Sequence, residues 1–166
     1  MPKNVSDPTA APNFLLSSVF LSLTIGIPFC LFKYLFGALA LRQGTALQVD
    51  WLIVFGWIFI LWAGIDLIMN IIRSTLELTI KKPLIEFCLI AQLGRIFKRQ
   101  SLFLTFDTFI SFSIICFVLW SGWIAQLKGY ETYLWFSATT INLVSLAMVN
   151  IWNEFHVISA SEPERL

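Results

Sequence analysis

The sequence predicts an all-α polytopic membrane protein, with four transmembrane helices and an amphipathic interfacial helix between the second and the third. Of its 166 residues, 58% are hydrophobic and 13% are charged, and the mean hydropathy is +0.80. Soluble domains carry about 25% charged residues, and a single core of this size cannot bury such an apolar surplus. Long apolar runs in lipid must be helical, because lipid offers the backbone no hydrogen-bonding partner. The run 51–62 also lacks the alternation of a β-barrel strand.

The charge balance excludes a protein that binds nucleic acid through an excess of basic residues. Eleven Lys and Arg residues oppose ten Asp and Glu residues, which leaves a formal net charge of +1. Binding to phosphate backbones depends on an excess of Lys and Arg, and this chain has no net excess of that kind. The apolar content equally excludes a chain that is disordered throughout, because disordered segments are poor in hydrophobic residues. We therefore expect the lipid bilayer, and not nucleic acid, to surround this protein.

Four segments are long enough to cross a bilayer, which takes about 20 mostly apolar residues at about 1.5 Å of rise each. The second is interrupted only by Asp66 and Asn70, the third only by Asp107, and the fourth carries no charge. The helix of the first segment can continue through residues 34–41, past the interface. The predicted spans are residues 14–32, 51–72, 102–127 and 132–153.

These spans form one transmembrane domain, residues 14–153, between two polar tails at 1–13 and 154–166. The first apolar run, at 19 residues, is longer than the roughly 7–15 residues of a signal peptide's apolar core. We therefore expect the run to be retained as a membrane anchor.

The distribution of cations predicts the orientation. Six of the eleven cations lie between the second and third spans, at Arg73, Lys81, Lys82, Arg95, Lys98 and Arg99. Loops rich in Lys and Arg stay on the cytoplasmic side. We expect the 73–101 loop on that side, or on its organellar equivalent. Because the number of spans is even, both termini are expected on the same side as this loop. A bacterial plasma membrane, a thylakoid-type membrane and an organellar membrane all remain open.

The 73–101 loop contains an amphipathic stretch over residues 83–99. Pro83 and Glu86 are favourable in a first helical turn. Apolar and basic side chains then lie largely on different sides, with Leu89, Leu93, Ile96 and Phe97 on one and Arg95, Lys98 and Arg99 on the other. One interpretation is an interfacial helix whose three cations bind anionic headgroups. The other is a short helix packed on the end of the bundle.

Charged and amide side chains inside the spans predict a buried polar cluster. Asp66 and Asp107 lie about two turns from the cytoplasmic ends of antiparallel helices, so they reach similar depth, roughly 9 Å from the boundary. Asn70 and Arg73 follow Asp66 on the same helix face. The expected cluster is Asp66, Asn70, Arg73, Asp107 and Asn150.

The cluster has two interpretations. Intramembrane carboxylates commonly mark proton or cation paths. Hydrogen bonds and ion pairs of this kind also hold transmembrane helices in register. The outer half of the bundle offers only Asn142 and a few hydroxyls, so no continuous polar path is apparent, and the structural interpretation is favoured.

The first span also carries a predicted helix-packing face. Ser18, Ser22 and Gly26 recur every four residues, a pattern of small side chains that lets another backbone approach closely. Pro28 follows, and because proline removes a helical hydrogen bond we expect a kink there. The pattern leaves open whether the partner helix is internal or belongs to another protein.

No catalytic, cofactor-binding or metal site is expected. The sequence has no HExxH, GxSxG or phosphate-binding glycine loop. Three cysteines without a CxxC pair, Cys30, Cys88 and Cys116, and one histidine, His156, are too few for a zinc site, and one histidine excludes bis-histidine haem. The protein is not expected to be an enzyme.

Short loops and the missing catalytic set together favour an accessory, assembly or scaffold subunit of a larger membrane complex. Its partners would be other membrane subunits or copies of itself. The alternative is a small oligomeric ion, proton or solute transporter that uses Asp66 and Asp107.

Overall fold

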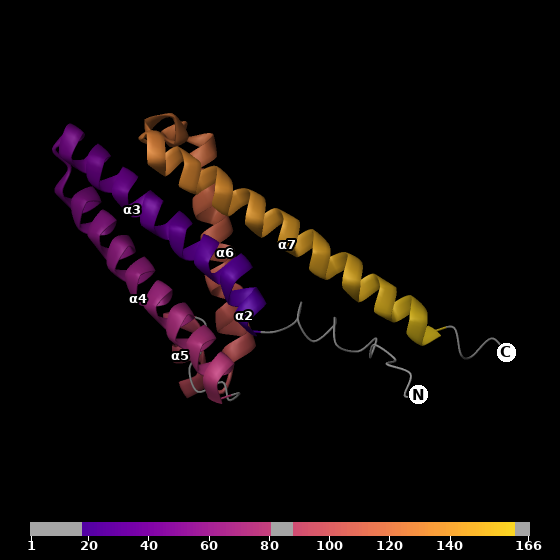
Figure 1. Ribbon diagram of the computed structural model, residues 1–166. Coiled ribbons are helices and arrows are strands. Elements are labelled where there is room, and N and C mark those ends of the chain that lie inside the picture. Colours follow the sequence, from indigo (N-terminus) through magenta and orange to yellow (C-terminus); the bar gives the residue numbers. More distant parts are fainter. Residues whose placement is uncertain (1–17, 81–87, 162–166) are drawn as a thin grey trace.

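The computed structural model describes residues 18–80 and 88–161, and within these ranges the chain forms helices and no strand. Elements α2, η1 and α3 follow one another directly and form one long rod (Figure 1). In chain order the elements are α2 (Ser18–Leu21), η1 (Ser22–Gly26, a π-helical turn), α3 (Ile27–Leu47), α4 (Asp50–Ile80), α5 (Leu89–Ile96), α6 (Gln100–Trp120), η2 (Trp123–Gln126, a 3₁₀ turn) and α7 (Gly129–Ser161).

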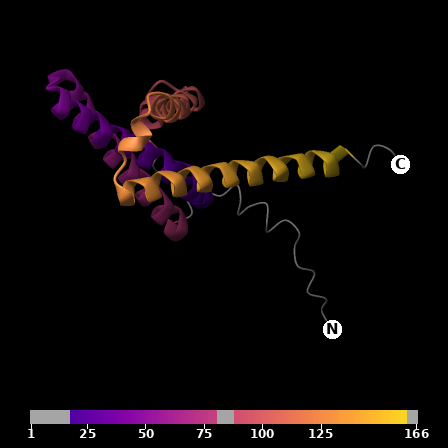
Figure 2. The ribbon, with the colours of Figure 1, turned by 90° about the horizontal axis from the view of Figure 1, so that it is seen from above.

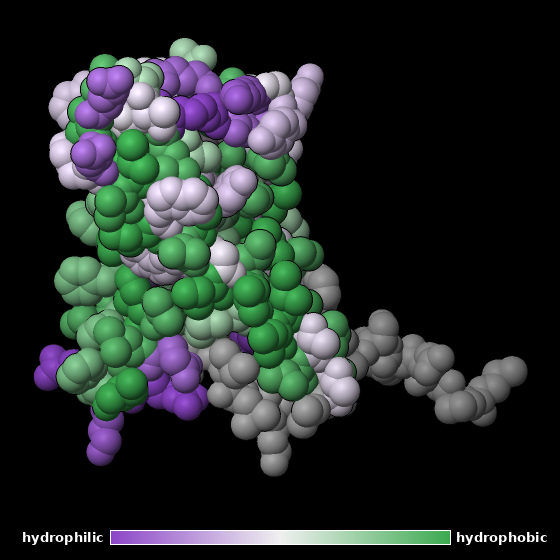
Figure 3. Space-filling view, turned by 90° about the vertical axis from the view of Figure 1, so that its left-hand side faces the viewer, coloured by the Kyte–Doolittle hydropathy of each residue, from purple (hydrophilic) through white to green (hydrophobic). Residues whose placement is uncertain are grey.

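Four of these helical stretches are long and apolar enough to cross a membrane, which confirms that part of the predicted fold. Figure 3 shows the corresponding surface, an apolar belt between two polar ends. Large apolar side chains are exposed around the bundle, among them Trp51, Ile68, Phe109 and Leu143. The protein is therefore a membrane-embedded helical bundle. The four stretches are Val19–Leu47, Asp50–Thr79, Ser101–Trp120 and Gly129–Trp152.

The bounds of the first three spans differ from the predicted ones. The first helix runs on to Leu47, past the predicted end at residue 32 and past its expected continuation through residue 41, so Lys33 lies in its middle. The second span ends at Thr79 instead of residue 72. The third ends at Trp120 instead of residue 127, because Gly122 adopts a left-handed conformation with φ of 74°. Glycine takes this conformation without the steric penalty of a side chain, and the helix cannot continue through it.

The predicted connector helix is shorter in the structure. Element α5 spans Leu89–Ile96, within the predicted 83–99, and Pro83 and Glu86 lie outside the described residues. Figure 1 places α5 at one end of the bundle, and both short connections, between α3 and α4 and between α6 and α7, at the other. We call these the α5 end and the turn end.

Helix α3 lies at the centre of the bundle. It contacts α4, α6 and α7, whereas those three helices make little contact with one another. Half of the residues in its span are buried, against 17% in α4 and 22% in each of α6 and α7. Figures 1 and 2 show α7 leaving the other helices toward its C-terminal end. A side chain on α3 can therefore meet groups from three different helices.

Glycines allow α3 and α4 to pack backbone to backbone. A Cβ atom on Gly37 would lie 2.8 Å from the backbone oxygen of Gly56, and one on Gly56 would lie 2.8 Å from that of Gly37. Gly44 repeats the arrangement nearer the turn, where a Cβ atom would lie 2.9 Å from the backbone nitrogen of Ile53. Small residues at transmembrane interfaces permit this close approach, and dispersion forces between the backbones then stabilise it.

Aromatic side chains fill the core around α3. Phe32 meets Trp135 of α7 edge to face at 5.0 Å between ring centroids, and Phe36 meets Phe59 of α4 in the same way at 5.0 Å. Edge-to-face contacts of this kind add about 0.5–1.5 kcal/mol beyond the burial of their area. The core residues are Phe29, Phe32, Leu35, Phe36, Leu39, Phe59, Ile114, Val118, Trp135 and Ala138.

Candidate functional site

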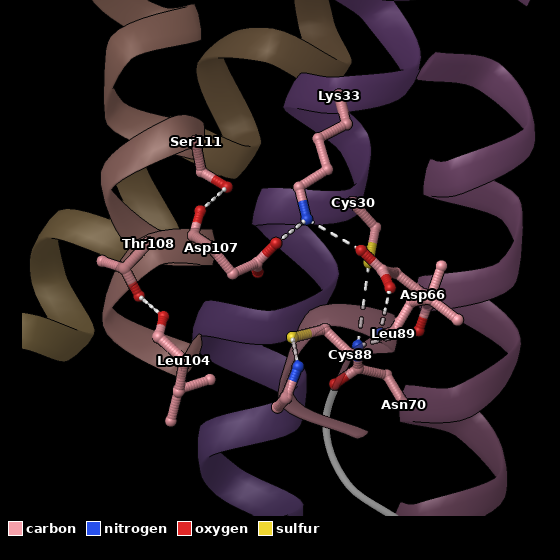
Figure 4. A network of polar contacts seen from close by, with 11 residues as sticks. Cys30, Lys33, Asp66, Asn70, Cys88, Leu89, Leu104, Asp107, Thr108 and Ser111 are labelled. Carbon is pink, nitrogen blue, oxygen red and sulfur yellow. Dashed lines mark hydrogen bonds and ion pairs between the residues drawn. The ribbon is translucent and has the colours of Figure 1, made fainter. Parts of the chain in front are cut away.

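Three charged side chains from three helices meet inside the bundle. Nζ of Lys33 on α3 lies 2.7 Å from Oδ2 of Asp66 on α4 and 2.5 Å from Oδ1 of Asp107 on α6 (Figure 4). The exposed fractions of these side chains are 1% for Lys33, 1% for Asp66 and 6% for Asp107. We call Lys33, Asp66 and Asp107 the ion triad.

The surroundings of Lys33 compensate for the loss of its water. Its ammonium group donates to both carboxylates and also lies 4.5 Å from the ring centroid of Trp62, a cation–π distance. Burying a charge is costly unless it is paired and hydrogen-bonded. Here the two carboxylates and the Trp62 ring together offset the cost of burying the ammonium group. With all three groups ionised, the ion triad carries a formal charge of −1.

Asp66 also anchors helix α5. Its Oδ1 accepts a hydrogen bond from the backbone N–H of Leu89 at 2.7 Å, at the first residue of α5. A carboxylate is favourable at a helix N-terminus, where backbone N–H groups are unpaired and the helix dipole is positive. The preceding residue, Cys88, caps the same helix, since its sulfur accepts from the backbone N–H of Ala91 at 3.4 Å. The α5 helix is therefore joined to the ion triad by its N-terminus.

Helix α5 packs through its small residues. Ala91 and Gly94 are buried, and a Cβ atom on Gly94 would lie 2.6 Å from Cβ of Phe103 on α6. The apolar residues predicted to form one side of the connector remain exposed, namely Leu89, Leu93, Ile96 and Phe97. Arg95, Lys98 and Arg99 are exposed as well.

Asn70 joins α4 to the rod before α3. Its Oδ1 accepts from the Ser22 hydroxyl at 2.7 Å, and its Nδ2 donates to the backbone oxygen of Asp66 at 2.9 Å and to the sulfur of Cys30 at 3.7 Å. A Cβ atom on Gly26 would lie 2.3 Å from Oδ1 of Asn70. The side chain of Asn70 therefore occupies space that is open only because residue 26 is a glycine.

This contact identifies the partner of the predicted helix-packing face. Ser22 and Gly26 face α4 of the same chain, and the side chain of Ser18 is outside the described part of the structure. The π-helical turn η1 ends two residues before Pro28, the residue at which a kink is expected. Proline has no N–H to donate to the preceding turn, and a wider π-helical turn accommodates that loss.

The structure brings together three of the five residues of the predicted cluster. Asp66, Asn70 and Asp107 meet around Lys33. Arg73 is buried further along α4, and the cation between the two carboxylates is Lys33. Asn150 is not brought into the cluster, because its side chain is exposed on α7.

Lys33 and Ser22 are the site residues that the sequence analysis did not place in the cluster. The signal for Lys33 was present, because it is the only charged residue between Asp7 and Arg42. Extending the first span to its full helical length would have placed this cation opposite the two intramembrane carboxylates.

A partly enclosed cavity of about 270 Å³ adjoins the ion triad. Its polar lining comprises Cys30, Lys33, Asp66, Asn70, Cys88, Asp107 and Thr108. Its apolar lining comes from the α2–η1–α3 rod, α6 and α7, and comprises Leu21, Ile25, Phe29, Leu104, Phe112 and Leu146.

A second ion pair lies at the turn end of the bundle. Arg42 of α3 pairs with Glu131 of α7 and donates to the backbone oxygen of Gln126 at 2.9 Å. Glu131 also accepts from the backbone N–H of Lys128 at 2.8 Å. This pair connects α3 to the beginning of α7, while the ion triad connects α3 to α4 and α6.

Among the described residues, no group of three His, Cys, Asp or Glu side chains is arranged to hold a metal ion. No family model, curated protein or solved structure matches this chain. The class that the fold and the site define is a membrane-embedded helical bundle with a central ion triad.

Proposed function

We propose that the protein is a non-catalytic accessory, assembly or scaffold subunit of a larger membrane complex, which it joins through the outward faces of its helices. The observation that carries this proposal is the arrangement of the ion triad. Lys33 donates to both Asp66 and Asp107, so the intramembrane charges hold the chain's own helices together. Networks of this kind give a membrane bundle a defined register, which a scaffold requires.

Helix α7 offers the best-defined surface for a partner. It contacts α3 and η1 and then leaves the bundle (Figures 1 and 2). An exposed stripe on it follows the three–four spacing of a helix-packing seam, with Ile141, Val144, Met148 and Ile151. The expected occupant is a transmembrane helix of another subunit.

Site-specific photo-crosslinking tests this proposal in the native membrane. A photo-reactive phenylalanine derivative replaces Val144 on the stripe or, as the control, Ile68, which is exposed on α4. We expect a discrete crosslinked product from position 144 that the additional substitutions M148W and I151W on the same stripe abolish, and none at that mass from position 68. Isolation of an uncrosslinked monomer from both positions, with no co-purifying protein after gentle solubilisation, would refute the proposal.

The alternative is a small oligomeric transporter that uses Asp66 and Asp107. The observation in its favour is the cavity, which places both carboxylates next to a space of about 270 Å³. Proton flux into liposomes that contain the purified protein separates the two proposals. Proton flux through the original protein that Asp107→Asn abolishes supports transport. No flux through the original protein, or flux that Asp107→Asn does not change, contradicts transport through this residue and favours the accessory role. Four short helices rarely enclose a pathway alone, so transport also requires a symmetric homo-oligomer.

We further propose that α5 lies in the headgroup region of the cytoplasmic-equivalent leaflet. Leu93, Ile96 and Phe97 are exposed beside the basic residues Arg95, Lys98 and Arg99, as expected of a helix that rests on anionic lipid. A membrane-impermeant maleimide tests the orientation. We expect it to label Lys98→Cys only in inside-out vesicles and Gln43→Cys only in right-side-out vesicles, and the reverse pattern contradicts the proposal.

A further inference from the structure

The three members of the ion triad differ in how completely they are hydrogen-bonded. Both oxygens of Asp66 accept, one from Lys33 and the other from the backbone of Leu89. Asp107 accepts from Lys33 through Oδ1, and within the described residues its Oδ2 accepts no hydrogen bond. Asp107 is also the most exposed of the three, at 6%, and it lines the cavity. Oδ2 of Asp107 is therefore the free acceptor of the site.

The charge of the site is also incompletely balanced. One ammonium group faces two carboxylates, so with all three groups ionised the site carries a formal charge of −1 in surroundings of low dielectric constant. Coulomb interactions are strong in such surroundings, so the site favours an additional positive charge and rejects a further anion. A carboxylate or phosphate headgroup is excluded by this charge. A hydroxyl group could donate a hydrogen bond to Oδ2, but it would leave the net charge in place.

The walls of the cavity fit an apolar chain. Phe29 of α3, Phe112 of α6 and Leu146 of α7 come from three separate helices and enclose the space only in part. Its volume of about 270 Å³ is close to the lower end of the roughly 300–1,000 Å³ of small-molecule sites. Because the cavity is only partly enclosed and its apolar walls lie within the apolar belt of the bundle (Figure 3), the molecule that suits it is one dissolved in the bilayer.

We propose that this cavity binds a membrane-dissolved amphiphile with a single apolar chain and a protonated amine as its head. The amine donates to Oδ2 of Asp107, which balances the charge of the ion triad, and the chain lies between Phe112 and Leu146. This inference is independent of the accessory role, because it concerns the interior of the bundle and not the outer face of α7.

Three ten-carbon probes that differ only in the head test the proposal, namely decylamine, decanol and decanoate. The full chain is placed in phosphatidylcholine nanodiscs at pH 7, and native mass spectrometry and titration calorimetry measure stoichiometry and affinity. We expect one decylamine per chain, bound at least about tenfold more tightly than decanol because its hydrogen bond is charge-assisted. We expect no saturable binding of decanoate.

Variants show whether binding takes place in this cavity. Asp107→Asn removes the charged acceptor, and Leu146→Trp fills the cavity without altering the ion triad, so both should abolish the saturable binding of decylamine. Glu154→Gln and Ile141→Trp change exposed positions outside the cavity and should preserve it. Leu146→Trp keeps the test valid if Asp107→Asn does not fold. Equal affinity for decanol, preference for decanoate, or decylamine binding that survives Leu146→Trp would each overturn the proposal.

Discussion

Lys33 on α3 and Asp66 on α4, 33 positions apart in the sequence, meet at 2.7 Å in the interior of the bundle. Asp107 completes the ion triad from α6, 74 positions from Lys33. Because α3 packs against α4, α6 and α7, which make little contact with one another in the described part of the chain, a single lysine on it can neutralise charge from two neighbours. The register of three helices is therefore linked through one ammonium group.

Removing that ammonium group should cost most of the stability of the bundle. Lys33→Met leaves Asp66 and Asp107 buried with no cation between them, and breaking a buried ion network in this way costs about 3–5 kcal/mol. Chemical unfolding in detergent at pH 8 measures the loss. Replacing the whole network, in K33M/D66N/D107N, should restore a large part of it, because the uncompensated carboxylates are gone.

The matched control for this prediction is Lys128→Met, at an exposed lysine outside the ion triad. Its free energy of unfolding should stay within about 0.5 kcal/mol of the original protein. If Lys33→Met unfolds at the same denaturant concentration as this control, the ion triad does not stabilise the fold.

The spans and the two carboxylates could be predicted from the sequence, because both depend on short-range regularities. Apolar runs have a length that the bilayer sets, and antiparallel helices bring Asp66 and Asp107 to similar depth. Lys33 was missed because a cation usually marks the end of an apolar run, so the predicted span stopped at residue 32. Lysine does not break a helix, and its pairing with two carboxylates compensates for its burial in the middle of the span.

The position of Asn150 could not be predicted because it depends on the direction of α7. Equal depth brings two residues together only if their helices also lie side by side. α7 packs on α3 near Trp135 and then on η1, and in this arrangement the side chain of Asn150 is exposed instead of facing Asp66. Crossing angles arise from side-chain packing between helices, and no local pattern in α7 specifies them.

The close approach of α3 and α4 should be sensitive to a single methyl group. In Gly37→Ala the new Cβ atom would lie 2.8 Å from the backbone oxygen of Gly56, and backbone cannot move aside as a flexible side chain can. We expect a loss of about 1–3 kcal/mol in the free energy of unfolding, typical of overpacking. Gly64→Ala is the control, because nothing lies within 4 Å of its Cβ position. Alanine is the better helix former, so this control should be neutral or up to about 1 kcal/mol more stable. Equal effects at both positions would contradict the packing.

The hydrogen bond between Ser22 and Asn70 should contribute measurably to the same helix pair. Ser22→Ala removes the donor to Oδ1 of Asn70, and the loss of one buried hydrogen bond costs about 0.5–1.5 kcal/mol. Ser113→Ala is the matched control, since that hydroxyl is exposed and bonds only the backbone oxygen of Phe109 in its own helix. Thermal unfolding that shifts equally in both variants would show that the contact between the helices contributes nothing.

Cys88 should resist thiol reagents at neutral pH. Burial, with a smaller contribution from Asp107, raises the pKa of its thiol from 9.0 to about 12, so the reactive thiolate is scarce at pH 8. We expect Cys88 to remain unmodified by iodoacetamide in the folded protein and to react fully after denaturation, as peptide mass spectrometry can measure. Rapid modification in the folded state would show that Cys88 is not buried.

The same shift has a consequence for stability at high pH. An acid whose pKa is raised in the folded state stays neutral there while the unfolded thiol ionises above 9.0. The contribution of Cys88 to the free energy of unfolding is therefore fully present below pH 9 and is lost as the pH rises toward 12. Cys88→Ala should remove this part of the pH dependence and leave the rest unchanged.

Arg42 and Glu131 should be coupled at the turn end of the bundle. Arg42 is 29% exposed and Glu131 only 4%, so water screens the arginine partly and the carboxylate hardly at all. Arg42→Gln leaves Glu131 with the backbone N–H of Lys128 at 2.8 Å and the Tyr130 hydroxyl at 3.5 Å as donors, and we expect a loss of about 1 kcal/mol. A double-mutant cycle with Glu131→Gln isolates the pair, because R42Q/E131Q should cost less than the sum of the single variants. Strict additivity in unfolding experiments would show that the two side chains do not interact in the folded protein. The coupling should weaken in 1 M salt, since screening reaches the exposed arginine, whereas the buried ion triad should respond far less.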